Sequence, residues 1–192
     1  MTTSALHDRT PPSSAASASS VHAARTDGAV LCTATILMGL IAGFFYAYAC
    51  SVMLGLAETD DRTFVLTMQS INATVRNAAF APSFFGSLVV TAVAAVMQWR
   101  RRDRAALRWI VAALVLYGGA FVITMGVSVP LNNELAGAGH PGLIENVATV
   151  RDDYEGPWVV WNIVRAVAST AAMACLVRAL MVRNGASGRS PR

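Results

Sequence analysis

Four polar or aromatic side chains share one face of a predicted helix in the segment Trp158-Val-Val-Trp161-Asn162-Ile-Val-Arg165. Their i, i+3, i+4, i+7 spacing is that of an α-helix, so two indoles, a carboxamide and a guanidinium point the same way. The guanidinium is permanently charged, and a charge within a membrane-length segment usually faces a bundle interior or a wet cavity. Arg165 is therefore a candidate functional residue. The alternative is that its side chain extends to the membrane interface and anchors the helix beside Trp158 and Trp161.

The composition indicates an integral membrane protein. Hydrophobic residues make up 55% of the 192-residue chain and charged residues 14%, whereas a soluble domain has about 25% charged residues. This length fits one helical bundle rather than two domains. The 15 basic residues are all Arg, which excludes Schiff-base catalysis and a phosphate-binding lysine. They cluster beside the apolar segments, which indicates membrane topology and not a nucleic-acid partner.

The sequence gives little support to metal or redox chemistry. All three cysteines lie in apolar segments without C-x-x-C or zinc-binding spacing, namely Cys32, Cys50 and Cys175. We interpret them as small buried hydrophobic residues, with a redox role as the alternative. One histidine, His140, lies near the predicted core. We therefore expect no metal site and no organic cofactor.

The predicted fold class is all-α, a bundle of four transmembrane helices. The apolar segments reach or exceed the ~20 residues that cross a bilayer, and we place the helices at about 29–57, 79–99, 107–129 and 157–180, with the third ending at Pro130. Apolar and polar stripes within residues 58–77 predict a short amphipathic helix between the first two, on the bilayer or at the bundle mouth. A long loop is expected between the third and fourth helices.

Flanking segments and charges complete the predicted organisation. Residues 1–28 are rich in Ser, Ala, Thr and Pro and should form a disordered tail. They precede one membrane domain at residues 29–182 and a disordered basic tail at residues 183–192. Arginines concentrate between the second and third helices and after the fourth, and most acidic residues lie in the other two connections. The positive-inside rule then predicts a multi-pass protein of the cell membrane with both termini in the cytoplasm.

This topology gathers polar residues in the outer half of the membrane. The fourth helix enters there with Trp161, Asn162 and Arg165, and the first helix ends there with Tyr48 and Ser51. The two outer connections add five carboxamides, those of Gln69, Asn72, Asn77, Asn132 and Asn133. Polar groups at this depth need partners, so the carboxamides could satisfy backbone groups at helix ends. The competing interpretation is a small-molecule pocket, in which a few polar groups converge between apolar walls.

Four short motifs occur in order along the chain: Gly39-Leu-Ile-Ala-Gly43-Phe-Phe-Tyr46, Met68-Gln69-Ser-Ile71-Asn72, Val129-Pro130-Leu-Asn132-Asn133 and Trp158-x-x-Trp161-Asn162-x-x-Arg165. Together they resemble the anthrone oxygenase-like family of small four-helix membrane proteins, over about residues 30–182. Asn77-Ala78-Ala79-Phe80 departs from the Asn-Pro-x-Phe expected in relatives, which puts the local turn geometry in doubt but not the fold.

The resemblance implies a cofactor-independent oxygenase of anthrone-type or other hydrophobic polyphenolic substrates. Arg165, assisted by Asn162, would then stabilise the substrate anion. The substrate-binding residues would be Trp158, Trp161, Gln69, Asn72, Asn132, Asn133 and Tyr48. No acid or histidine in the predicted helices faces this site as a general base. Four candidates would reach it only if the outer connection folds inward, namely Asp152, Asp153, Glu155 and His140.

Two other function classes stay open. A non-catalytic membrane protein that binds a lipid or a small aromatic molecule, or an accessory subunit, would use the same pocket without a base. Multi-substrate transport has less support, because four helices without an acidic residue inside the membrane offer no proton relay. The expected partners are membrane lipids and a small hydrophobic aromatic substrate.

Overall fold

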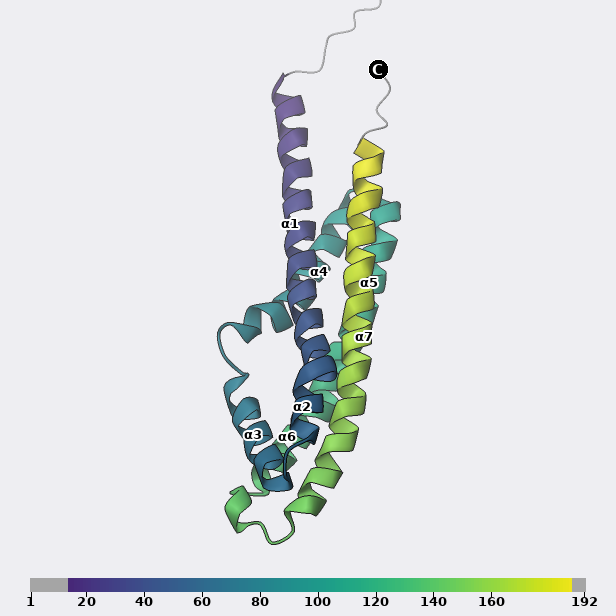
Figure 1. The fold of residues 1–192 in the computed structure, drawn as a ribbon. Coiled ribbons are helices and arrows are strands. Elements are labelled where there is room, and N and C mark those ends of the chain that lie inside the picture. Colours follow the sequence, from purple (N-terminus) through teal and green to yellow (C-terminus); the bar gives the residue numbers. More distant parts are fainter. Residues whose placement is uncertain (1–13, 188–192) are drawn as a thin grey trace, which may run out of the picture.

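The computed structural model describes residues 14–187 and shows an all-α bundle (Figure 1). Its first long helix consists of three consecutive segments, α1 (Ser14–Ala47), the π-helix η1 (Tyr48–Val52) and α2 (Met53–Ala57). The short α3 (Asp61–Thr74) and the long α4 (Phe80–Arg100) follow. The third long helix joins α5 (Arg104–Ile123), the π-helix η2 (Thr124–Ser128) and α6 (Val129–Gly137). A 3-10 turn, η3 (Pro141–Leu143), leads to the last long helix, α7 (Val147–Ser187).

Four stretches are long and apolar enough to cross a membrane, namely Arg25–Ala57, Phe80–Arg100, Arg104–Gly137 and Val147–Arg183. Their outward faces carry exposed apolar side chains such as those of Val115, Val122 and Val167. Extensive exposed apolar surface is expected where lipid surrounds the protein. These features confirm the predicted all-α fold with four membrane helices, and they indicate a multi-pass membrane protein.

The long helices pack in a ring, because α7 contacts α1 and α5, and α4 contacts the same two helices. The buried face of α1 repeats at helical spacing through Leu31, Ala34 and Met38, and α7 presents small residues such as Ala172 and Ala179. Small side chains let membrane helices approach closely. Figure 1 shows the start of α1 and the end of α7 at one end of the bundle, with α3 and α6 at the other. This second end holds the candidate site.

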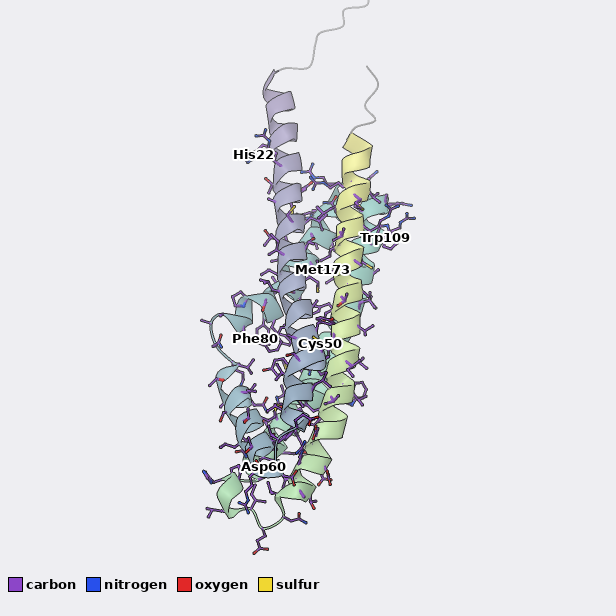
Figure 2. All side chains as sticks on the ribbon, viewed as in Figure 1. His22, Cys50, Asp60, Phe80, Trp109 and Met173 are labelled. Carbon is purple, nitrogen blue, oxygen red and sulfur yellow. The ribbon has the colours of Figure 1, made fainter. Side chains whose placement is uncertain are left out.

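The predicted amphipathic helix is present as α3, and it folds onto the bundle mouth. Asp60 begins it by accepting a hydrogen bond from the backbone N–H of Thr63 at 3.1 Å, as helix N-caps do. Figure 2 labels Asp60 at this end of the molecule. The apolar stripe of α3 buries Phe64, Val65 and Met68 in a cluster with residues of α6 and α7. That packing places the polar stripe of α3 beside the bundle interior.

The ends of the first and last helices differ from the sequence prediction. Residues 14–28, which we expected to be part of a disordered tail, continue α1 as helix, consistent with the high helix propensity of their alanines. Asp27 in this stretch is 5% exposed and forms an ion pair with Arg101, in the turn after α4. At the other terminus, α7 extends through residues 183–187 of the predicted basic tail. Residues 1–13 and 188–192 lie outside the described part of the chain.

The prediction that the third helix ends at Pro130 is wrong. Proline lacks the N–H that bonds to residue i−4, but Pro130 follows the wider π turn of η2 and lies in the first turn of α6. Proline is well tolerated in a first helical turn. The helix therefore continues to Gly137, and the expected long loop is reduced to residues 138–146, with η3 inside it.

The prediction that the cysteines are buried is also wrong for two of the three. Cys32 and Cys50 are exposed, and Cys175 is half-buried. Figure 2 labels Cys50, which belongs to η1. An apolar thiol on an outward face is compatible with a lipid surrounding, so hydrophobicity alone could not assign these residues to the core.

Candidate functional site

A cavity of about 480 Å³ lies at the end of the bundle that carries α3 and α6. This volume is typical of small-molecule sites. All four long helices and α3 contribute to its wall. The apolar part of the wall includes Phe44, Phe45, Ile71, Val75, Phe80, Phe84, Phe85, Met125, Val129 and Trp158. The polar part consists of Tyr48, Gln69, Asn72, Arg76, Asn77, Thr124, Ser128, Asn132, Asn133, Asn162 and Arg165. Figure 2 labels Phe80, where α4 begins.

The guanidinium of Arg165 is the buried charge of this cavity. The side chain is 4% exposed, and its central carbon lies 4.6 Å from the ring centroid of Phe45 and 5.4 Å from that of Trp158. One terminal nitrogen donates to the Thr124 hydroxyl at 3.4 Å, and the other to Oδ1 of Asn162 at 3.3 Å. Its Nε has no hydrogen-bond partner. None of the ion pairs among the described residues involves Arg165.

Asn162 links this charge to the first helix. Its side chain is 1% exposed, and Nδ2 donates to the backbone carbonyl of Phe45 at 3.0 Å. Its Oδ1 is thereby turned toward Arg165, one helical turn further along α7. Because both ends of the carboxamide are engaged, Asn162 fixes the position of α7 relative to α1 and orients the guanidinium.

A second hydrogen-bond network fixes the indole of Trp158. Asn132 Oδ1 accepts from Trp158 Nε1 at 3.0 Å and from the Tyr154 hydroxyl at 2.9 Å. The Tyr154 hydroxyl in turn accepts from Nδ2 of Asn72 at 3.1 Å. The Tyr48 ring lies 5.5 Å from the Trp158 ring, centroid to centroid. Residues of η1, α3, α6 and α7 thus hold one aromatic face against the cavity.

The sequence profile of the anthrone oxygenase family matches residues 74–175 of this chain, just over half of its length. The chain belongs to the anthrone oxygenase family. No curated protein and no solved structure matches it.

The part of the chain matched to the anthrone oxygenase family runs from the end of α3 into α7. It includes Asn132, Trp158, Asn162 and Arg165. The first helix and most of α3 precede it, so Tyr48 and the other cavity residues of these elements lie outside the matched region. The resemblance predicted from short motifs extended further, over residues 30–182.

The structure brings eight of the nine predicted site residues to the cavity wall, the exception being Trp161. The Trp161 side chain is 37% exposed. It is not among the residues that line the cavity, although its spacing places it on the same broad helix face as Trp158. The assignment of Trp161 to substrate binding therefore stays a prediction, which its place outside the cavity wall does not support.

Two of the predicted carboxamides differ in what they contact. Gln69 Nε2 donates to the backbone carbonyls of Leu135 at 2.8 Å and Gly139 at 2.9 Å, so it satisfies the C-terminal end of α6. This is the backbone role that we considered as the alternative to ligand binding. Asn133 is exposed and lines the cavity. Its side chain is the more accessible of the two to a ligand.

Several site residues were not predicted from the sequence. Tyr154 precedes Trp158 by four residues, and this i, i+4 spacing could have placed both side chains on one face of the helix. Phe45 had none beyond its apolar character, although it supports Arg165 and accepts from Asn162. The π-helices η1 and η2 border the cavity through Tyr48 and Thr124. Such π turns occur frequently at functional sites, and no residue pattern here indicated them.

The four proposed general bases do not reach the cavity. Asp152, Asp153 and His140 are exposed, and Glu155 pairs with Arg151 at 2.6 Å. Arg151 also donates to the Thr59 carbonyl and to Asp61, which ties the connection after the first helix to α7. Arg151 thereby holds two of the acids, Asp61 and Glu155, in ion pairs. Within the described residues, no group of three or more His, Cys, Asp or Glu could hold a metal ion.

Proposed function

We propose that this protein is a membrane-embedded oxygenase of hydrophobic polyphenols of the anthrone type, and that the cavity described above is its active site. Arg165 carries the proposal, because a buried guanidinium without a carboxylate partner is suited to stabilise a negative charge that arises during a reaction. Membership of the anthrone oxygenase family supports the reaction class.

The chemistry of an anthrone matches the groups that line the cavity. Its methylene lies between two aromatic rings, and loss of one methylene proton gives an anion delocalised onto the carbonyl oxygen opposite. This electron-rich anion can react with O2 directly, without a metal or an organic cofactor. One oxygen atom becomes the new carbonyl group, and the other leaves as water with both methylene hydrogens. The protein then needs an apolar cavity, a fixed cation and a way to remove the proton.

The cavity residues have distinct roles in this proposal. Arg165 would bind the anionic oxygen, and Asn162 would hold the guanidinium in place through its contact with Phe45. Trp158, fixed by Asn132, would offer a flat surface for the fused rings. Phe80 and Phe84, stacked with ring centroids 5.3 Å apart, would form part of the apolar wall that limits access of water.

Binding without turnover is the second candidate function. It is favoured by one observation: the cavity wall, as far as the structure describes it, includes no Asp, Glu or His. A protein that stores or presents a hydrophobic aromatic molecule, or an accessory subunit, has no need of a base. The same cavity and the same cation would serve an aromatic anion in that role.

The distribution of charged residues between the two ends of the bundle supports a location of the cavity at the outer side of the membrane. The arginines of the turn between α4 and α5 lie at the bundle end where α1 starts and α7 finishes, and the acidic connections lie at the other end. By the positive-inside rule, the protein would reside in the cell membrane with both termini in the cytoplasm. The cavity would then open toward the outer side, within reach of substrates dissolved in the bilayer.

Oxygen uptake by membranes that contain the protein tests the proposed oxygenase. With an anthrone present, wild type should consume one O2 per quinone formed, and Arg165→Gln should lose about 100-fold or more of the rate, as loss of one group that stabilises a transition-state charge typically does. The matched control is Arg178→Gln, the same change at an exposed position of α7 outside the cavity wall. Uptake no faster than in empty membranes would refute the oxygenase, and ligand retention without product would identify a binding protein.

A further inference from the structure

The charged residues of the cavity wall are all positive. Arg76 and Arg165 are the charged residues of its wall, and the described wall includes neither a carboxylate nor an imidazole. Arg76 is exposed and lies just after α3, whereas Arg165 is buried. The remaining titratable group is the Tyr48 phenol, which is protonated and a poor base near neutral pH, since a tyrosine has a pKa of about 10. The cavity thus attracts anions and offers no efficient proton acceptor.

The hydrogen-bond donors of Arg165 are also largely unused. A guanidinium carries five N–H groups. The two bonds that it forms, at 3.4 and 3.3 Å, lie beyond the usual 2.7–3.2 Å range, and Nε has no acceptor. Hydrogen bonds to charged donors are normally short, so these contacts leave room for a stronger acceptor. An oxygen that carries a full negative charge is the chemical class that satisfies this group best.

We infer that the cavity binds its aromatic substrate as an oxyanion that has already released its proton to water, so that Arg165 takes the place of a general base. The inference rests on the proposed function only for the type of substrate, a phenol or the enol form of an anthrone. In this inference the protein selects the ionised form of the substrate, and the solvent removes the proton.

The proton balance of this step is simple. In solution, an anthrone forms its enol when water removes a methylene proton and the carbonyl oxygen gains one. The O–H bond of the enol or phenol then breaks, its electron pair stays on oxygen, and the proton passes to water or buffer. No residue changes its protonation state. A cation within hydrogen-bond distance lowers the pKa of an acidic group by about 1–3 units. The ratio of ionised to neutral substrate would therefore be about 10- to 1000-fold higher for the bound substrate than for the free substrate at the same pH. This enrichment makes a protein base unnecessary.

The test uses 2-hydroxyanthraquinone, a three-ring phenol that changes colour when it ionises and does not react with O2. We would titrate the dye with pH in the presence of purified protein in lipid nanodiscs, with empty nanodiscs as the reference for partition into lipid. The pKa of the bound dye should fall by about 1–3 units relative to empty nanodiscs for wild type and for the control Arg178→Gln. The shift should disappear in Arg165→Gln and persist in part in Arg165→Lys, which retains the charge.

A comparison of ligands requires no variant and covers the case in which Arg165→Gln fails to fold. The methyl ether, 2-methoxyanthraquinone, has nearly the same shape but cannot ionise. Wild type should bind the phenol at least 10-fold more tightly than the ether above the pKa of the bound dye. Equal affinities, or a dye pKa that is unchanged or raised in wild type, would overturn the inference.

Different experimental results would refute the inference and the proposed function. Ionisation of the dye that depends on Arg165, together with no O2 uptake on an anthrone, would leave anion binding in place and remove the oxygenase. Rapid O2 uptake with no effect on the ionisation of the dye would establish the oxygenase and show that a protein group removes the proton.

Discussion

The guanidinium carbon of Arg165 lies 4.6 Å from the centre of the Phe45 ring, so an aromatic ring of α1 supports the charge that α7 carries. The indole of Trp158 provides a second such contact at 5.4 Å. A cation over an aromatic ring gains about 2 kcal/mol when it is desolvated, which offsets only part of the several kcal/mol that burial of an ion costs. The protein thus retains a charge that its fold alone does not require.

We predict that Arg165→Met will make the protein more stable while it removes activity. Methionine fills much of the same volume with apolar atoms, and replacement of buried charges by hydrophobic residues is often neutral or stabilising by about 1–4 kcal/mol. Unfolding of the purified protein in detergent should show a higher midpoint for this variant than for wild type. The matched control is Arg178→Met, at an exposed position of the same helix. A clear loss of stability in Arg165→Met alone would identify Arg165 as a structural residue.

Asn132 is predicted to be the main polar support of the aromatic wall. Asn132→Ala removes the shared acceptor of Trp158 and Tyr154, and each buried donor left without a partner costs about 1–3 kcal/mol. The variant should therefore lose about 2 kcal/mol or more of unfolding free energy, and its KM for an anthrone should rise because the indole is no longer held. Asn133→Ala, one position further and exposed, is the control and should change stability by less than about 0.5 kcal/mol. Similar losses in both variants would contradict the assigned network.

The sequence was a good guide to α7 because the cavity lies against a narrow arc of this helix. At about 100° per residue, Asn162 and Arg165 lie within about 40° of Trp158, on opposite sides, whereas Trp161 lies about 60° away. The i, i+3, i+4, i+7 rule groups all four, but the cavity faces only the centre of that arc. Trp161 consequently falls on the exposed side, and helical spacing alone could not distinguish it from the other three.

The cavity wall contributed by α1 and η2 could not be predicted in the same way. Phe45 contacts Arg165 from a helix about 120 residues earlier in the chain, and apolar residues of a membrane helix look alike whether they face lipid or core. The π turn of η2 also shifts the register of the helix, so that Pro130 no longer marks its end. The number of membrane helices could be predicted from composition and charge. The contacts between residues of different helices depend on packing and could not.

The beginning of α3 is predicted to loosen in acid. The hydrogen bond from the Thr63 side chain to Asp60 holds the pKa of this carboxyl below its usual range. A group with a depressed pKa in the folded state stabilises it above the unfolded-state pKa, and that contribution is lost as the pH falls through the folded pKa. Hydrogen exchange of residues 61–66 should therefore accelerate, after correction for intrinsic rates, as the pH falls from about 5 to 3. Asp60→Asn, which keeps a good N-cap without a titrating group, should show a weaker pH dependence. Equal dependence in both proteins would exclude Asp60 as the cause.

Orientation in the membrane is predicted to place the cavity end outside the cell. Two exposed alanines offer a matched pair of probes, Ala148 in the first turn of α7 and Ala105 in the first turn of α5. Each would be changed to Cys in a background in which the three native cysteines are replaced by alanine, which leaves every charge in place. On intact cells, a membrane-impermeant maleimide should label Ala148→Cys, and it should label Ala105→Cys only after the cells are permeabilised. The reverse pattern would place the termini outside and would show that the arginines between α4 and α5 do not set the topology by the positive-inside rule.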